Sequence, residues 1–323
     1  MVTESKQKKI PEPFGLTSLP PFPVIERSMT WKRPNRMHVI GESEANPGIA
    51  EVYNDIKSSL SLPQVPLVFQ MCAAIGPFLP QFWEAVKPVV RTRAFLAAAQ
   101  RLRADAYTRM HNYFEIPAAS DSFGLAAPPE LAATLELFHY QGGALLLLLS
   151  LAAEALDNPI GQPFVSREAG SPQTFGFAPI LVEDEAAAPG TRKVLDEARR
   201  QYGLGVVPLE FRALAAWPAF LNQHWQLWKQ MTHSPILAAC EHQLLPHSFE
   251  LAHALPGPVE LSSATLRQNG MTEEEFSGIV RFTNHWNRAS AMLLLQIAAA
   301  KISVEGGNVH PRPREENRQV QAA

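Results

Sequence analysis

The strongest candidate for chemistry in this sequence is an acid, Glu210, in an otherwise mostly apolar stretch. It stands in VPLEFRALAAWP, residues 207–218. Burying a carboxylate costs free energy unless the group is paired or has a task. Two interpretations are open. Glu210 is either a general base whose pKa is raised by apolar neighbours, or a carboxylate that pairs with Arg212 or begins a helix.

Two histidines and an arginine form a second candidate group. His139 and His285 occupy matching positions in two similar segments, LFHYQGGALLLLLSLAA at 137–153 and TNHWNRASAMLLLQIAA at 283–299. If they face each other across a symmetry axis, they could serve as acid–base groups or ligands. Two hydrogen-bonded core histidines are the alternative, which we favour. Arg288 would suit an anionic carboxylate, with a surface charge as its alternative.

The remaining reactive residue types predict neither a metal nor a cofactor. Cys240, His242, His247 and His253 are separated by two, five and six residues, which fits neither one helix face nor a zinc pattern. The sequence shows no glycine-rich phosphate loop, GxSxG elbow or nucleotide fingerprint. With Cys72, Cys240 makes up the whole cysteine content. This count predicts no disulfide framework and favours a reducing cytoplasm.

Composition excludes several classes of partner. The 323 residues carry a net charge of −3, so there is no basic footprint for nucleic acid. The apolar run at 142–156 is shorter than the roughly 18 to 20 residues that a membrane span requires, and we expect it to form a buried helix. The first residues lack the apolar stretch of a secretory signal. We therefore expect a soluble, cytoplasmic protein without a membrane or nucleic-acid partner.

The elements that position these residues are helices, and they occur twice. VPLVFQMCAAIGPFLPQFWEAVK at 65–87 matches VPLEFRALAAWPAFLNQHWQLWK at 207–229 in roughly 11 of 23 positions, at an offset of about 142. Apolar residues recur at helical spacing, and strand signals are absent. The sequence predicts an all-α fold of two helical repeats packed as a pseudo-dimer about a pseudo-twofold axis. The predicted parts are an extended proline-rich leader (1–48), repeat 1 (49–156), a linker (157–190), repeat 2 (191–303) and a polar tail (304–323).

Individual helices are predicted within these repeats. One begins near Gly48, a second covers 69–86 with a break at Gly76-Pro77, and a third covers 89–113. The fourth starts at Glu130. In the second repeat, helices are expected over 192–202, through 207–229, over 232–254, and after Thr272. Thr272 and Glu275 have the spacing of a capping box.

The doubled pattern, with FRALAAWP at 211–218, resembles the group I (DehI-type) 2-haloacid dehalogenases over most of residues 49–302. The resemblance implies an α-helical pseudo-dimer with a pocket between its halves. It also implies a hydrolase that acts on carbon–halide bonds without a cofactor. In that family an activated water attacks the Cα of a small 2-halocarboxylic acid directly and expels halide with inversion, so no ester intermediate forms.

The family's site residues fall on mostly different residue types here. The water-activating aspartate falls on Glu210, the preceding serine on Leu209, and the water-orienting asparagine on Gly142. The other three positions, two aromatic wall residues and a pocket tyrosine, fall on Gln64, Leu67 and near Thr283. The resemblance therefore implies a divergent active site.

Two other functions remain open at this point. His139, His285 and Glu210 could form a different acid–base or metal-assisted site at the repeat interface, or the chain could be a non-catalytic helical scaffold. The expected partners are a small carboxylic-acid substrate and water as nucleophile. Formation of a homodimer is left open.

Overall fold

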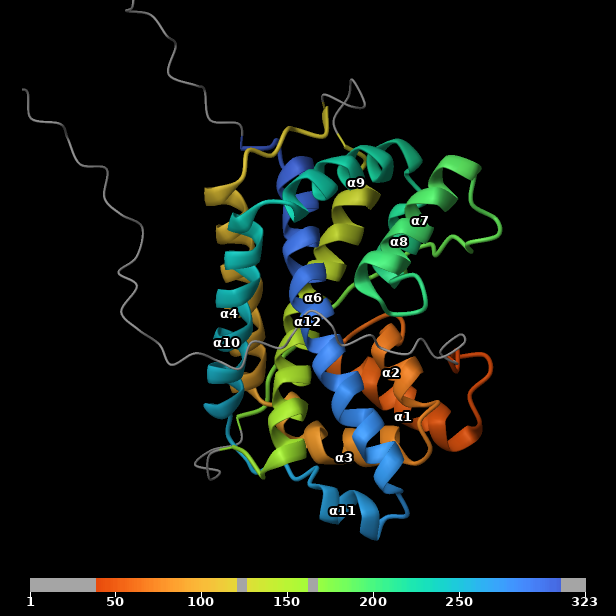
Figure 1. Cartoon of the computed structure of the whole chain (residues 1–323), viewed down its shortest axis with the longest axis vertical. Coiled ribbons are helices and arrows are strands. Elements are labelled where there is room, and N and C mark those ends of the chain that lie inside the picture. Colours follow the sequence, from red (N-terminus) through yellow and green to blue (C-terminus); the bar gives the residue numbers. More distant parts are fainter. Residues whose placement is uncertain (1–38, 121–126, 162–167, 309–323) are drawn as a thin grey trace, which may run out of the picture. The chain divides into compact units, whose positions relative to one another are not determined.

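A computed structural model describes residues 39–120, 127–161 and 168–308 of the chain. Within these ranges the protein is helical, with no strand and two isolated β-bridges (Figure 1). The helices are α1 (Pro47–Leu60), α2 (Leu67–Cys72), α3 (Phe78–Val90), α4 (Arg93–Tyr113), α6 (Pro129–Asp157), α7 (Pro189–Tyr202), α8 (Leu209–Leu214), α9 (Pro218–Thr232), α10 (Pro235–His253), α11 (Ser263–Gln268) and α12 (Glu273–Val304). The prediction of a helical fold without strands is confirmed.

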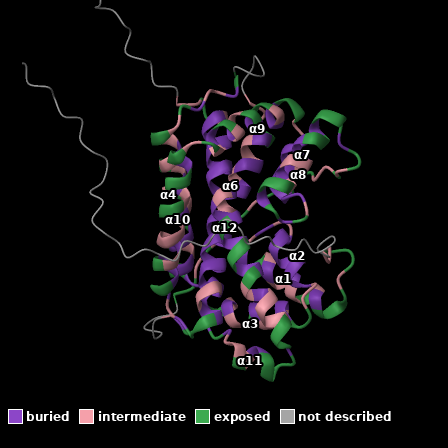
Figure 2. Cartoon of the chain, in the orientation of Figure 1, coloured by how far each residue is buried: buried purple, intermediate pink, exposed green. Residues whose placement is uncertain are grey.

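The two longest helices, α6 and α12, form the centre of this helical body. They pack against each other, and both pack against α4 and α10. Figure 2 shows that their central parts are mostly buried. By length and composition alone α6 could cross a membrane, but 83% of its apolar window is buried inside the protein. The prediction of a buried core helix is therefore confirmed.

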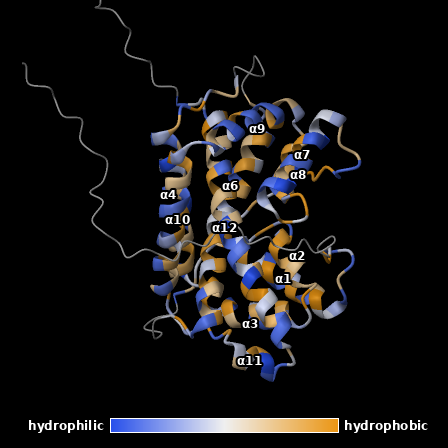
Figure 3. Cartoon of the chain, in the orientation of Figure 1, coloured by the Kyte–Doolittle hydropathy of each residue, from blue (hydrophilic) through white to orange (hydrophobic). Residues whose placement is uncertain are grey.

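The shorter helices form two groups beside this central pair. In the view of Figure 1, α1–α3 lie in the lower part and α7–α9 in the upper part. Figure 3 shows hydrophilic and hydrophobic residues alternating along the outer helices α4 and α10, as expected for helices with one face in water. Each group contains a helix of six residues, α2 or α8, that begins directly after a proline, Pro66 or Pro208.

Local sequence explains where several helices begin. The Asn46 side chain accepts a hydrogen bond from the Ile49 amide at 3.0 Å, which caps α1. At the start of α12, Thr272 and Glu275 accept from each other's backbone amides. The predicted capping box is therefore confirmed.

Some predicted boundaries are wrong. The helix expected from Val89 begins at Arg93, because α3 continues to Val90 with Pro88 inside it, and Thr92 then caps α4. The helix predicted at 192–202 begins earlier, at Pro189. This proline takes a first-turn position of α7, where no amide donor is needed. In the leader predicted at 1–48, residues 1–38 lie outside the described residues, and α1 already begins at 47. In the tail predicted at 304–323, residue 304 ends α12, and 309–323 lie outside the described residues.

Within the linker predicted at 157–190, residues 168–188 form a connecting segment without helix. An isolated antiparallel bridge joins its first part to the start of α4, between Thr92 and Ala169. The segment then leads into α7. It runs along helices that carry candidate site residues.

Candidate active site

Glu210 is the second residue of α8. Pro208 has φ −57° and ψ 143°, so the chain is extended up to that point and the helix starts immediately afterwards without a side-chain cap. The side chains next to it, Leu209 and Phe211, are buried. Glu210 itself is only 8% exposed. The fold therefore holds this carboxyl group in an apolar interior.

The Glu210 carboxyl group has no ion-pair partner within the described part of the chain. Arg212, the pairing alternative, is instead tied to Glu183 and to the backbone carbonyl of Val182. Burial raises the pKa of Glu210 to about 7, and only a hydrogen bond from its own backbone amide opposes this rise. A carboxyl group with this pKa exchanges protons near neutral pH, which suits a general base.

Tyr202 is a neighbour of Glu210 that the sequence analysis did not identify. Its hydroxyl donates a hydrogen bond to the Gln296 side chain of α12. Its ring lies 5.9 Å from that of Phe211. Burial, followed by the nearby Glu210 charge, raises the pKa of Tyr202 well above its ordinary value. Tyr202 therefore stays neutral and links the surroundings of Glu210 to the central helix α12.

The two candidate histidines rest against different helices. His139 on α6 is 3% exposed, with its Nε2 3.1 Å from the carbonyl oxygen of Arg103 on α4. Burial lowers the pKa of His139 to about 4, so it is neutral at pH 7. His285 on α12 places its Nε2 2.9 Å from the carbonyl oxygen of Tyr202 on α7. Each histidine thus contacts a backbone carbonyl. His139 is the buried, hydrogen-bonded core histidine that we favoured, but the prediction of a core position is wrong for His285, which is exposed.

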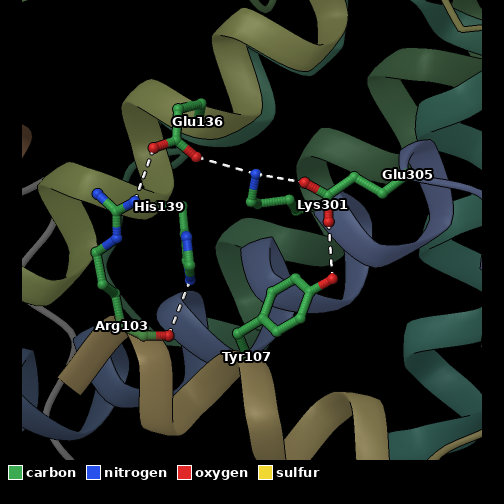
Figure 4. Close-up of polar contacts among 6 residues, drawn as sticks. All are labelled: Arg103, Tyr107, Glu136, His139, Lys301 and Glu305. Carbon is green, nitrogen blue, oxygen red and sulfur yellow. Dashed lines mark hydrogen bonds and ion pairs between the residues drawn. The ribbon is translucent and has the colours of Figure 1, made fainter. Parts of the chain in front are cut away.

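His139 also belongs to a polar network that joins α4, α6 and α12 (Figure 4). Glu136 contacts Arg103 at 2.8 Å and Lys301 at 3.0 Å. Lys301 in turn contacts Glu305, which accepts a hydrogen bond from Tyr107. Burial raises the pKa of Glu136, but the Lys301 hydrogen bond and the Arg103 charge lower it overall. Because its two cations and two acids balance, this network is best explained as a structural link between helices.

The other positions suggested by the resemblance lie on several elements. Leu67 and Leu209 are the buried first residues of α2 and α8. The Gln64 amide nitrogen is buried and has no hydrogen-bond partner among the described residues. Thr283 is buried on α12. Gly142 on α6 lies so close to α12 that a Cβ atom there would be 3.1 Å from Leu294 Cδ1.

Arg288 lies at the surface. Its side chain is 63% exposed, and its Nε is 3.2 Å from the carboxylate of Glu241 on α10. The residues near Cys240 also face separate partners, since His247 contacts Asp105 and His253 contacts Glu154. In residues 39–120, 127–161 and 168–308, no three His, Cys, Asp or Glu side chains are placed to hold a metal ion. Cys72 and Cys240 are free and buried.

A cavity of about 380 Å³ lies elsewhere, beside α3 and α11. Its lining includes Gln81, Glu84, Glu260 and Asn269, and none of the predicted site residues. Both carboxyl groups in this lining, Glu84 and Glu260, belong to exposed residues. We base the candidate site on Glu210 instead, because its carboxyl group is buried and has a raised pKa.

Known proteins resemble this chain over most of its length. The family described as "Halocarboxylic acid dehydrogenase DehI" matches residues 63–207. An (R)-2-haloacid dehalogenase of Pseudomonas putida is 22% identical over 275 residues, which are 81% of this chain and 91% of that protein. An (R)-2-haloacid dehalogenase of Rhizobium sp. (strain NHG3) is 25% identical over 233 residues, which are 70% of this chain and 90% of that protein.

A solved structure is also similar in fold. It is the complex of a D-2-haloacid dehalogenase mutant with D-2-CPA, and it superposes with a TM-score of 0.78 at 21% identity. The match covers 84% of this chain and 98% of the solved chain. The helical arrangement described above is therefore that of a known fold.

Proposed function

Because this chain resembles the DehI-type 2-haloacid dehalogenases in its motifs, in its sequence relatives and in its fold, we propose that it hydrolyses the carbon–halide bond of a small 2-halocarboxylic acid. The observation that carries the proposal is the buried carboxyl group of Glu210, which has no ion-pair partner among the described residues and whose pKa is raised to about 7. It lies where the resemblance puts the water-activating acid.

In this proposal Glu210 is the general base. Its carboxylate takes a proton from water as the water oxygen forms a bond to the substrate Cα. The carbon–halide bond breaks on the opposite face, and its electron pair leaves with the halide. The products are a 2-hydroxy acid of inverted configuration, halide and a proton, which Glu210 returns to solvent. No oxidant, reductant or cofactor is needed.

Glutamate instead of aspartate changes the reach of the base. The extra methylene moves the carboxylate by about 1.5 Å, a distance that matters for alignment of water and Cα. α8 begins at residue 209, so Glu210 is fixed on the first turn of a helix rather than on a loop. We propose that Tyr202, which lies near Glu210 and donates a hydrogen bond to Gln296 on α12, helps to hold this turn in place.

We also propose that residues 49–156 and 191–303 are repeats related by a pseudo-twofold axis. In support, α1, α2, α3, α4 and α6, with 14, 6, 13, 21 and 29 residues, are followed by α7, α8, α9, α10 and α12, with 14, 6, 15, 19 and 32 residues, and α11 is inserted. One side-chain arrangement also recurs. Trp83 donates to Asp55 at 2.7 Å beside Lys87, and at an offset of 142 Trp225 donates to Glu197 at 2.6 Å beside Lys229.

The contacts of the histidines differ between the proposed repeats. His139 contacts α4, whereas His285 contacts α7, so the metal-assisted or acid–base alternative with Glu210 gains no support from their geometry.

The location proposed for the protein is the cytoplasm, in keeping with two free buried cysteines. Homodimer formation remains a prediction that size measurement in solution can test.

The proposed function is tested by halide release from each enantiomer of 2-chloropropionate. Wild type is expected to release chloride and form lactate of inverted configuration. Glu210→Gln should lose this activity, and Glu154→Gln, a change on α6 at a carboxylate paired with His253, should keep it. Under single-turnover conditions in ¹⁸O-labelled water, the label should enter the product and not Glu210. Chloride release undiminished in Glu210→Gln would contradict the proposal.

A further inference from the structure

The connecting segment is held at its first end by the junction of α3 and α4. The amide of Gly170 donates to the carbonyl of Arg91 at 3.0 Å, and the amide of Arg93 donates to the carbonyl of Glu168 at 2.9 Å. A Cβ atom at residue 170 would lie 3.0 Å from the Thr92 carbonyl oxygen, so glycine allows this close approach. This end is therefore fixed by backbone contacts.

At its other end the segment is held by the helix that carries the proposed base. The amide of Val182 donates to the Arg212 carbonyl at 3.0 Å, and Arg212 Nε donates back to the Val182 carbonyl at 3.3 Å. The Arg212 guanidinium also pairs with Glu183. Arg212 is two residues after Glu210 on α8. Near its second end, the segment thus passes beside the turn of the candidate base.

Between these ends, the segment alternates between two faces. Phe175, Phe177, Pro179 and Leu181 are half-buried, while residues 174, 176, 178 and 180 are exposed. Phe175, Phe177 and Leu181 pack against the core. This period of two is that of an extended chain with one face on the protein.

The inward face meets α6 through aromatic contacts. The Phe175 ring lies 5.3 Å from the Tyr140 ring, and Phe177 lies 6.5 Å from Phe175. The Tyr140 hydroxyl donates to the carbonyl oxygen of Leu60 at 3.2 Å, which fixes the ring. Tyr140 is two residues before Gly142 on the same helix. The segment therefore spans from the turn of α6 at Gly142 to the turn of α8 at Glu210.

We propose that Phe175 and Phe177 are specificity-determining residues that form the substrate-facing wall of the site and limit the length of the alkyl group on Cα. This rests on the proposed function. A pocket for a small 2-halo acid needs apolar surface around a few polar groups. Gln64 and Leu67, where the resemblance puts aromatic wall residues, supply no aromatic ring. The connecting segment places the Phe175 ring against Tyr140 on α6 and the Phe177 ring against Phe175, five residues before Val182 bonds to α8.

The test compares substrate length profiles. Phe175→Ala and Phe177→Ala are measured beside Phe114→Ala, a half-buried phenylalanine at the end of α4 that serves as the matched control. The substrates are 2-chloropropionate, 2-chlorobutyrate and 2-chlorohexanoate. Burying one methylene group of the substrate changes its binding equilibrium about fourfold. The ratio of kcat/KM for chlorohexanoate to that for chloropropionate should therefore rise about tenfold or more in either segment variant. The control should leave this ratio unchanged.

A kcat/KM ratio within twofold of wild type in both segment variants, with melting temperatures lowered as in the control, would contradict the proposed role of these two phenylalanines. The segment would then be only a connection between helices. If wild type releases no halide from any substrate, the proposed function fails instead. The wall is then judged by calorimetric titration of lactate and 2-hydroxyhexanoate into the same proteins. Selectively tighter binding of 2-hydroxyhexanoate to Phe175→Ala or Phe177→Ala supports the wall. Equal binding across the set, or none, overturns it.

Discussion

Replacing Glu210 by glutamine should abolish turnover and at the same time make the protein more stable at alkaline pH. The amide keeps the shape of the side chain but neither accepts the proton from water nor becomes charged. A lost general base lowers the rate by about 10² to 10⁴. The opposite signs of the two effects distinguish this variant from one that merely damages the fold.

The size of the stability effect follows from the pKa. Burial raises the pKa of Glu210 from its ordinary value of 4.5 to about 7, so the folded protein holds the proton more tightly than the unfolded chain does. The stabilisation from the protonated form is complete below pH 4.5 and is lost as the pH rises through about 7. At about 1.4 kcal/mol per pH unit, the loss is on the order of 3 kcal/mol.

Two measurements check this. Urea unfolding gives the free energy of unfolding of wild type and Glu210→Gln at pH 4.5 and pH 8.5. From the lower to the higher pH, the free energy of unfolding of the variant should rise by about 3 kcal/mol relative to that of wild type. In wild type, kcat/KM should rise with pH and level off above about 7, because only the carboxylate accepts a proton.

A stability difference that does not change with pH would refute the reasoning, since it would mean that the Glu210 carboxylate is solvated or paired in the folded protein. A wild-type pH–rate profile that is already flat below pH 6 would do the same. Surface Glu154→Gln serves as the control for both assays, because its carboxylate is 37% exposed.

Other expected outcomes test the surroundings of the site. Gly143→Ala should destabilise the protein by more than about 2 kcal/mol in urea unfolding, because the new Cβ would lie 2.6 Å from the Ala99 carbonyl oxygen. Gly142→Ala should cost less, since Leu294, 3.1 Å away, is a side chain that can shift; equal losses would contradict this distinction. Thr272→Ala should lower the free energy of unfolding by about 1 kcal/mol through the lost cap of α12, and an unchanged value would mean that this end is frayed. Metal analysis of the purified protein should find no stoichiometric zinc or iron, and one equivalent per chain would favour the metal-assisted alternative.

Much of the fold could be predicted because its signals are local. Apolar spacing, prolines and the Thr272–Glu275 pair each act within a few residues, and they placed most helices correctly. The helix predicted from Val89 starts four residues later, because α3 continues through Pro88 to Val90 and Thr92 provides the actual cap of α4. A single proline can be accommodated in a helix when the lost hydrogen bond is compensated by packing.

The site was only partly predictable. Glu210 stands out because an acid replaces Val68 in a matching apolar segment, and its burial agrees with that reasoning. The hydrogen bond between Tyr202 and Gln296 joins residues 94 positions apart. No spacing rule reveals such a pair. Likewise, the inward face of the connecting segment covers few residues within a proline-rich stretch, so its alternation is evident only beside the helices that it contacts.

The glycine pair on α6 has a practical consequence for directed evolution. At both positions the space that a new side chain would need is already occupied. Leu294 occupies it at position 142, and the Ala99 carbonyl occupies it at position 143. Most members of a library that randomises 142 or 143 alone would fail to fold rather than acquire a new specificity. Position 142 becomes productive only when Leu294 is varied with it toward smaller residues, whereas 143 faces backbone and should be left unchanged. A search for better catalysts should therefore couple changes on the two central helices.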